Sequence, residues 1–289
     1  MRILITGADG QLGHELQRTL HAHDLVLGIW PGFDLLQPEA ARFIVEARPD
    51  VVIHAAAYTN VERAESEPEL AMAVNAEGTE RVARACAEVR ARLVYVSTDY
   101  VFDGRKATPY LEQDEPNPLG VYARSKREGE KRAQAHCPKG LIVRTSWLYG
   151  LEGRNFVKTI IQLAVEQSEL RVVADQYGSP TYAKDLAGAL NQMLNYGLTG
   201  IVHATGSGEC TWHEFACEIL SLMEFRVPVR PISTEEAKQA APRPRYSVLN
   251  NSVLAQTGMA LPHWKDALAR YLKDVHAKTQ LLSTAEKKS

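Results

Sequence analysis

Two hydrophobic patterns alternate along the first half of the chain. Short apolar runs, typical of buried strands, occur at residues 3–5, 25–27, 51–53, 93–96 and 141–143. Between them lie longer stretches in which apolar residues recur every three or four positions, as on one face of a helix. These stretches fall near residues 12–20, 40–47, 71–88 and 122–135. The alternation predicts an α/β fold built on a doubly wound parallel sheet.

After residue 150 the pattern is less regular. We expect helices near residues 156–166, 184–194 and 212–223, and a strand near 200–204 that returns to the sheet. Four prolines between residues 227 and 246 predict a loop-rich surface, and the polar tail after Lys273 is expected to fray. We therefore expect a Rossmann-like domain at residues 1–168, joined by the returning strand, and a smaller, loop-rich lobe at residues 169–289 that interleaves with it.

Composition narrows the class of protein. The 289 residues include 33 basic and 35 acidic side chains, so the net charge of −2 gives no reason to expect nucleic acid or an anionic membrane as a partner. No apolar stretch approaches the roughly 20 residues that span a bilayer, and the N-terminus does not read as a signal peptide. We expect a cytoplasmic protein with no membrane partner. The four cysteines form no CxxC pair and are interpreted as reduced thiols.

Three glycines stand between the first predicted strand and the first predicted helix. Gly7, Gly10 and Gly13 have GxxGxxG spacing. At this position backbone N–H groups and the positive end of the helix can receive a pyrophosphate. A plain tight turn is the alternative, but the βαβ setting favours a dinucleotide site. The first domain is therefore predicted to bind a dinucleotide.

The end of the second predicted strand bears on cofactor choice. An NAD-selective site usually has an acidic residue there, which accepts hydrogen bonds from the adenosine ribose. Here the first acidic residue is Asp34, which comes late, and no Arg or Lys stands nearby. The sequence therefore predicts use of either NADPH or NADH. The alternative for Asp34 is an N-cap of the helix that begins near Pro38.

A Tyr-x-x-x-Lys pair lies in a predicted helix. Tyr122 and Lys126 share one helix face, where an ammonium group would favour ionisation of the phenol and bring its pKa toward neutral pH. A solvated helix face is the alternative. Ser97, Thr98 and Asp99 directly follow a predicted strand, at the sheet edge where such folds bind ligands. This placement favours a catalytic interpretation.

Together these residues resemble the extended short-chain dehydrogenase/reductases. Longer stretches resemble one branch, the dTDP-4-dehydrorhamnose reductases. They are AAAYTNV at 55–61, STDYVFDG at 97–104, RTSWLY at 144–149 and DQYGSPT at 175–181. The resemblance extends from residue 1 to about 271. It implies reduction of the C4 keto group of dTDP-4-dehydro-L-rhamnose to dTDP-L-rhamnose with NADPH or NADH, in nucleotide-sugar and polysaccharide biosynthesis.

The resemblance also implies roles for individual residues. Tyr122 would protonate the sugar C4 oxygen, Lys126 would hold the nicotinamide ribose and tune Tyr122, and Thr98 would bond the carbonyl. The implied cofactor contacts are Gly7, Gly10, Gln11, Leu12, Gly13, Asp34, Leu35, Ala57, Tyr58, Thr59, Tyr122 and Lys126. The implied substrate contacts are Thr98, Asp99, Tyr122, Trp147 and Val61. Core packing is the alternative for Trp147.

The diphosphate of a nucleotide sugar needs a cation, and the Pro-rich segment offers three arginines. Arg243 is the candidate for substrate binding because it stands in a run that resembles the family's Arg-Pro-x-Asn-Ser-x-Leu. A solvated loop residue is the alternative. Tyr246 replaces the amide of that run, which puts thymidine specificity in doubt. Glu15 matches an acidic position of metal-linked dimers in the family, but no other ligand can be placed, so no metal is predicted; the chain would be a monomer or homodimer.

Other functions remain open on sequence grounds. The glycine turn and the Tyr-x-x-x-Lys pair also occur in nucleotide-sugar epimerases and dehydratases and in other nucleotide-sugar reductases. Dehydratases usually place acidic residues beside the Thr, and here only Asp99 follows. A non-catalytic regulatory subunit, of the kind that binds methionine adenosyltransferase, is a further alternative. The presence of Thr98, Tyr122 and Lys126 counts against it.

Overall fold

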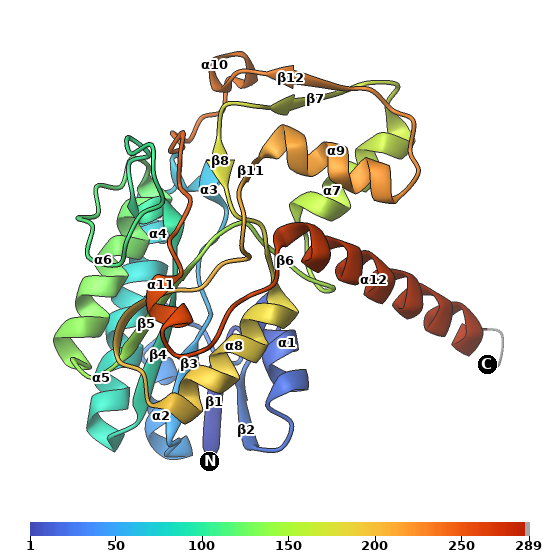
Figure 1. The fold of residues 1–289 in the computed structure, drawn as a ribbon. Coiled ribbons are helices and arrows are strands. Elements are labelled where there is room, and N and C mark those ends of the chain that lie inside the picture. The colour runs from blue at the N-terminus through green and yellow to red at the C-terminus, as the bar shows by residue number, and fades with distance from the viewer. Residues whose placement is uncertain (287–289) are drawn as a thin grey trace.

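A six-stranded parallel sheet lies at the centre of the part of the chain that the structure, a computed structural model, describes, which is residues 1–286 (Figure 1). The strand order is β10-β5-β4-β3-β1-β2, and every neighbouring pair is parallel. The strands are β1 (Arg2–Thr6), β2 (Asp24–Gly28), β3 (Val51–His54), β4 (Arg92–Thr98), β5 (Leu141–Thr145) and β10 (Gly200–His203). The predicted α/β fold class and parallel sheet are confirmed, and each predicted strand lies in this sheet.

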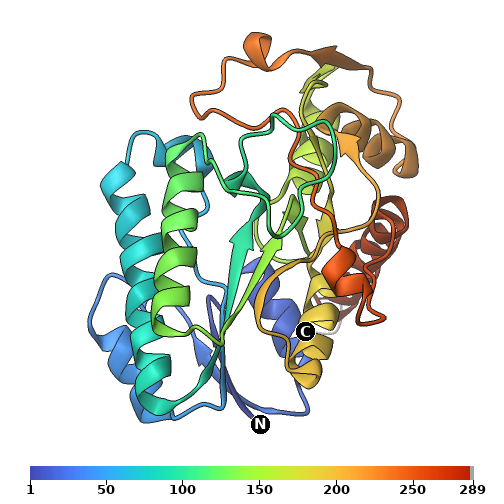
Figure 2. The same cartoon turned by 60° about the vertical axis from the view of Figure 1, so that its left-hand side comes forward.

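Helices cover both faces of the sheet (Figures 1 and 2). One face packs against α1 and α8, because Leu12 and Leu16 of α1 and Leu190 of α8 share one core cluster with the strands. The other face packs against three helices that share a second core cluster. The helices are α1 (Gln11–Thr19) and α8 (Ala183–Tyr196), then α2 (Glu39–Ala47), α5 (Thr79–Val89) and α6 (Val121–His136).

The strand order reverses between β1 and β3, which carry the chain to opposite sides of the sheet. In open α/β sheets a ligand crevice lies at such a point, outside the carboxyl ends of the strands. Short elements surround that edge: α3 (Val61–Ala64), α4 (Pro68–Met72), the π-helix η1 (Ala73–Gly78) and the 3₁₀ helix η2 (Asp99–Val101). The helix predicted at residues 71–88 is thus interrupted by a π-helical turn.

A third core cluster packs above the sheet, in the upper part of Figure 1. It is rich in aromatic rings, among them Tyr149, Phe215 and Trp264, and all three are buried. The helices and strands that contribute to it are β6 (Leu148–Tyr149), α7 (Phe156–Glu166), β7 (Leu170–Val173), β9 (Thr181–Tyr182), β11 (Cys210–Thr211), α9 (Trp212–Leu222), β12 (Val229–Ile232) and α12 (Trp264–Glu286). Strand β8 (Tyr177–Gly178) pairs with β11, and α10 (Thr234–Ala237) contacts β7. Helix α11 (Ser252–Ala255) packs instead against β10 of the central sheet. The domain boundary at residue 168 stays a prediction.

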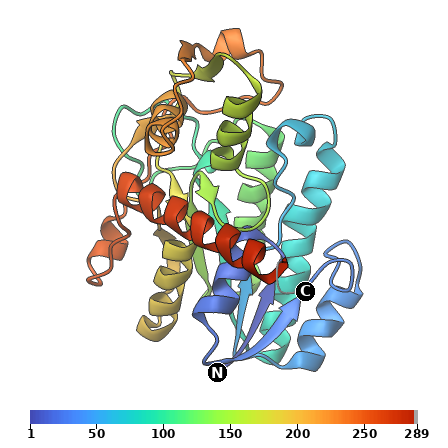
Figure 3. The same cartoon turned by 90° about the vertical axis from the view of Figure 1, so that its right-hand side faces the viewer.

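From Lys273 to Glu286 the tail does not fray as expected; it continues α12, the long helix at the right of Figure 1 and across the front of Figure 3, and the last three residues lie outside the described part. Two of its polar residues are anchored by side chains from other elements. Asp274 accepts hydrogen bonds from Lys184 Nζ at 2.7 Å and from the hydroxyl of Tyr182 at 2.9 Å, and Lys278 pairs with Glu152 at 2.6 Å. Polarity was therefore a poor guide to order in this segment. Of the helices within residues 1–286, none has the length and apolar character needed to cross a membrane.

Candidate active site

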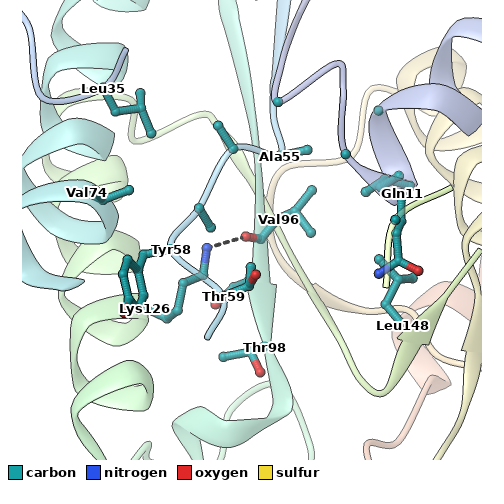
Figure 4. Close-up of a pocket in the computed structure, with 18 of the residues that line it drawn as sticks. Gln11, Leu35, Ala55, Tyr58, Thr59, Val74, Val96, Thr98, Lys126 and Leu148 are labelled. Carbon is teal, nitrogen blue, oxygen red and sulfur yellow. Dashed lines mark hydrogen bonds between the residues drawn. The ribbon is translucent and has the colours of Figure 1, made fainter. Parts of the chain in front are cut away.

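A cleft of about 870 Å³ opens at the carboxyl edge of the sheet. The turn after β1, the segments after β3 and β4, and the first turns of α6 line it. Figure 4 shows Lys126 reaching from α6 toward Val96 of β4, with Gln11 and Leu148 on the opposite side. The cleft therefore lies where the reversal of strand order places a ligand crevice.

The glycine turn fits a dinucleotide. Gly7 has a φ of +65°, which is unfavourable for other residues, and a Cβ on Gly13 would lie only 2.2 Å from the carbonyl oxygen of Gly7. The turn and α1 can approach this closely only because both positions lack side chains. Gly10 precedes α1 without a side-chain cap, so the first N–H groups of the helix are left for a ligand. Backbone donors at a helix start suit a pyrophosphate group.

Three side chains with acid–base or polar chemistry meet on the other side of the cleft. Thr98 ends β4, Tyr122 is the second residue of α6, and Lys126 follows one turn later. The side chain of Thr98 interacts with the phenol of Tyr122 and acts to lower its pKa. Lys126 donates from Nζ to the carbonyl oxygen of Val96 at 2.8 Å and lies over the ring of Tyr95, 4.2 Å from its centroid. The helix thus fixes both the phenol and the ammonium group against β4.

Burial sets the ionisation of this pair, contrary to our expectation that the ammonium would bring the phenol pKa toward neutral. Burial raises the pKa of Tyr122 to about 12, and the charge of Asp99 adds to the rise while the Thr98 side chain opposes it. Burial also lowers the pKa of Lys126 to about 7, although Glu130 opposes this. Tyr122 is therefore protonated at neutral pH, as a proton donor must be.

Asp99 lies beside the pair and is buried. Its carboxylate accepts a hydrogen bond from Ser247 Oγ at 2.6 Å and from Thr98 Oγ1 at 3.1 Å. Burial raises the pKa of Asp99 to about 7, and these two bonds oppose the rise. Asp99 thus connects the catalytic strand end to a segment near the C-terminus.

Asn75 was not anticipated from the sequence. It lies in the π-helix η1, accepts a hydrogen bond from the backbone N–H of Tyr58 at 2.8 Å, and donates to the carbonyl of Tyr58 at 3.0 Å. It also donates to Ser125 Oγ of α6 at 2.9 Å. One amide therefore ties the segment after β3 to the helix that carries Tyr122 and Lys126. π-Helical turns are often found at functional sites, but a helical period does not reveal them.

Glu130, one turn beyond Lys126, was also missed. It is buried and accepts two hydrogen bonds from Arg144 at 2.8 and 2.9 Å, and one from Ser97 at 2.6 Å. Burial acts to raise the pKa of Glu130, but Arg144, Ser97 and Arg127 outweigh it and lower the pKa. This ion pair fixes α6 against β4 and β5 beneath the site.

Most residues named from the sequence line the cleft. They are Gly7, Gly10, Gln11, Leu12, Gly13, Asp34, Leu35, Ala57, Tyr58, Thr59, Thr98, Asp99, Tyr122, Lys126 and Trp147. Two of them, Val61 and Arg243, are not among the lining residues. The rule that ligands bind at the carboxyl ends of parallel strands (the carboxyl-edge rule) therefore predicts the position of the cleft. It does not predict the positions of Val61 and Arg243, which lie outside the sheet.

Asp34 lies at the end of the cleft formed by the segment after β2. Its Oδ1 accepts a hydrogen bond from the N–H of Leu36 at 2.9 Å, whereas Pro38 precedes α2. The N-cap alternative is therefore wrong. Trp30, with 68% of its surface exposed, lines the same end. Among the cleft residues that the structure describes, the only Lys and Arg are Lys126 and Arg154.

Trp147 combines the two roles considered for it. Its ring stacks on that of Trp212 with centroids 3.4 Å apart, which is core packing. It also lines the cleft, and its buried Nε1 has no hydrogen-bond partner. A buried indole N–H usually has a partner, so this donor suits a polar ligand group.

Arg243 pairs with Glu62 instead of facing the cleft. Its Nη1 lies 2.5 Å from Glu62 Oε1, and only 14% of its side-chain surface is exposed. Glu15 pairs with Arg18 at 2.7 Å. Among residues 1–279, whose side chains the structure describes, no three His, Cys, Asp or Glu residues group in a way that could hold a metal ion.

The parallel sheet, the glycine turn, and the Thr, Tyr and Lys side chains at its carboxyl edge together define the extended short-chain dehydrogenase/reductase class. Within this class the chain belongs to the family described as RmlD substrate binding domain, whose model matches residues 1–277.

Named relatives agree with this family. The dTDP-4-dehydrorhamnose reductase of Mycobacterium tuberculosis (strain H37Rv) is 42% identical over 281 residues, which cover 94% of this chain and 92% of that protein. The crystal structure of the Bacillus anthracis dTDP-4-dehydrorhamnose reductase in complex with NADP is 43% identical, has a TM-score of 0.91, and is matched over 94% of this chain and 99% of that chain. The crystal structure of the Clostridium acetobutylicum dTDP-4-dehydrorhamnose reductase has a sequence 42% identical to this chain and a TM-score of 0.93. The match covers 96% of this chain and 100% of that chain.

Proposed function

We propose that this chain reduces the C4 keto group of dTDP-4-dehydro-L-rhamnose to give dTDP-L-rhamnose, with NADPH or NADH as the reductant. The observation that carries the proposal is the meeting of Thr98, Tyr122 and Lys126 in the lining of one cleft, with Lys126 one helical turn from Tyr122. A protonated phenol beside a second hydroxyl can hold and protonate a carbonyl oxygen. The family and its named relatives supply the substrate.

The dinucleotide fits the residues on the other side of the cleft. Gly7, Gly10 and Gly13 leave space and backbone donors for its pyrophosphate, and Lys126 supplies a donor for its ribose. When bound, it supplies the hydride for C4. Leu35 and Asp34 lie at the end that we assign to adenosine.

The chain's own residues carry the proton chemistry. Tyr122 donates the proton of its Oη to the sugar C4 oxygen, and its pKa of about 12 keeps that proton in place until it is needed. Thr98 orients the same oxygen through its hydroxyl. Lys126 holds a position one turn away, where its positive charge stabilises the phenolate that Tyr122 becomes. Trp147 offers its unpaired Nε1 to the sugar.

The same arrangement disfavours a non-catalytic role. A binding subunit has no need for Thr98, Tyr122 and Lys126 to meet at one cleft, yet all three line it. For a dehydratase, the carboxylate beside Thr98 is Asp99, which is already bonded to Ser247. These contacts support a reductase. A cytoplasmic location, and a monomeric or homodimeric state, remain predictions.

A direct assay tests the proposal. The purified full-length chain is mixed with NADPH and dTDP-4-dehydro-L-rhamnose, and cofactor oxidation is followed at 340 nm. The control substrate is its precursor epimer, dTDP-4-dehydro-6-deoxy-D-glucose. We expect rapid oxidation with the L-sugar and at least tenfold slower oxidation with the control. Equal rates would argue for another nucleotide-sugar reductase, and no oxidation with either sugar would refute the proposal.

A further inference from the structure

The segment from Ala240 to Ser247 is hydrogen-bonded at both ends to residues close to the cleft. Glu62 Oε2 accepts hydrogen bonds from the N–H groups of Ala240 at 2.8 Å and Ala241 at 3.2 Å. At the other end, Ser247 Oγ donates to Asp99 at 2.6 Å. Between these two attachments lies Arg243. The segment is thus tied both to α3, beside the cofactor side of the cleft, and to the residue that follows Thr98.

Within this segment, the side chain of Arg243 interacts with both Glu62 and Tyr100. It pairs with Glu62 at 2.5 Å, and its guanidinium also interacts with the phenol of Tyr100 and acts to lower its pKa. Burial acts to raise the pKa of Glu62, but Arg243 and the two backbone N–H groups outweigh it, so that the pKa is lowered and the carboxylate stays ionised. The pair is therefore charged at neutral pH and largely shielded from water on the arginine side.

Tyr100 carries this link to the proton donor. Its ring packs edge-on against the ring of Tyr122, with centroids 6.3 Å apart and planes at 84°. Its backbone N–H donates to Thr98 Oγ1 at 3.2 Å. A shift of Tyr100 would therefore move both partners of the Thr98–Tyr122 pair.

We infer that Arg243 is a positioning residue: by joining Glu62 to Tyr100 it fixes Tyr122 and Thr98, and it does not bind the diphosphate of the substrate. This inference rests on the proposed reductase function for its kinetic test. The positioning role replaces the substrate-binding role that the sequence predicted for Arg243, and it agrees with the absence of Arg243 from the cleft lining.

The two roles predict different kinetics. A diphosphate ligand binds ground and transition states alike, so its loss raises KM for the nucleotide sugar and leaves kcat nearly unchanged. A positioning residue acts on the placement of the reacting groups, so its loss lowers kcat. We expect Arg243→Gln to lower kcat roughly tenfold, with KM for the nucleotide sugar within about twofold. Arg245→Gln is the matched control, because Arg245 lies in the same segment and its side chain is 77% exposed.

A double variant tests whether Arg243 acts through Tyr100. Tyr100→Phe removes only the hydroxyl with which Arg243 interacts and keeps the ring against Tyr122, so this variant should fold. We expect it to lower kcat by a similar factor, and we expect the double variant Arg243→Gln/Tyr100→Phe to be no slower than the slower single variant. Independent, multiplying effects would contradict the inference, as would a tenfold rise in KM at unchanged kcat.

A measurement without turnover separates this inference from the proposed function. With ¹³C-labelled tyrosine, the ring signal of Tyr122 is assigned by its loss in Tyr122→Phe. We expect Arg243→Gln to shift this signal and Arg245→Gln to leave it in place. An unchanged Tyr122 signal in Arg243→Gln overturns the inference, whether or not the wild-type chain reduces the sugar.

Discussion

Lys126 donates a hydrogen bond from its ammonium group to the carbonyl oxygen of Val96, 2.8 Å away. This bond fixes the catalytic helix α6 to strand β4 two residues before Thr98. Because Tyr122 lies one turn earlier on α6, the phenol, the threonine hydroxyl and the ammonium group are held by one rigid contact between a helix and a strand. Sites built on such elements keep their geometry better than sites on loops.

The first prediction concerns the proton donor. Replacing Tyr122 by Phe removes the proton and leaves the ring in place, so we expect kcat to fall by roughly 10²–10⁴-fold, as for the loss of a general acid. Cofactor affinity, measured by fluorescence titration with NADPH, should change by less than about threefold. A variant with near wild-type turnover would exclude Tyr122 from the chemistry.

The second prediction concerns pH and stability. The pKa of Lys126 is about 7 in the folded protein, below its ordinary value of 10.5. Between these pH values the unfolded chain binds more protons than the folded one, so this lysine makes stability rise with pH. Denaturant unfolding should show that this group raises the free energy of unfolding by on the order of 2 kcal/mol between pH 7 and pH 9. The Lys126→Met variant should lack this rise. Equal pH dependence in both proteins would show that Lys126 is not buried as described.

The third prediction concerns cofactor choice. A 2′-phosphate is usually recognised by an arginine or lysine, yet the segment 28–36 that lines the adenosine end contains neither. We expect kcat/KM for NADH and NADPH to agree within about tenfold, or roughly 1.4 kcal/mol. Steady-state rates with each cofactor measure this directly. A preference above a hundredfold would mean that a cation outside this segment reaches the phosphate.

The fourth prediction concerns Asn75. Asn75→Ala leaves the backbone N–H and carbonyl of Tyr58 without their partner, and an unsatisfied buried group costs about 1–3 kcal/mol. Part of this loss should appear as weaker NADPH binding, by roughly three- to thirtyfold in calorimetric titration. Asn195→Ala, at the exposed end of α8, serves as the control. Unchanged binding in Asn75→Ala would show that the Tyr58 segment does not depend on this amide.

Much of this site could be predicted because its chemistry follows the order of strands. Thr98 comes directly after an apolar run and Gly7 directly after another, so the carboxyl-edge rule brings them to one crevice without further information. The spacing of Tyr122 and Lys126 likewise places both side chains on one face of a helix.

What could not be predicted depends on contacts between distant segments. The pairing of Arg243 with Glu62 joins residues from opposite ends of the chain, and neither position shows it in a local pattern. The direction of the Tyr122 pKa shift follows from burial, which spacing does not reveal. The polar end of α12 is ordered because Asp274 meets Lys184, a partner that only the fold supplies.

Transfer of deuterium tests the central claim most directly. The chain is incubated with dTDP-4-dehydro-L-rhamnose and NADPH that carries deuterium at the transferable nicotinamide C4 position, and the sugar product is analysed by NMR and mass spectrometry. The account predicts dTDP-L-rhamnose with a single deuterium at sugar C4, and no such product from Tyr122→Phe at equal enzyme concentration and short times. Product without deuterium at C4, or a dehydrated or epimerised sugar, would contradict it.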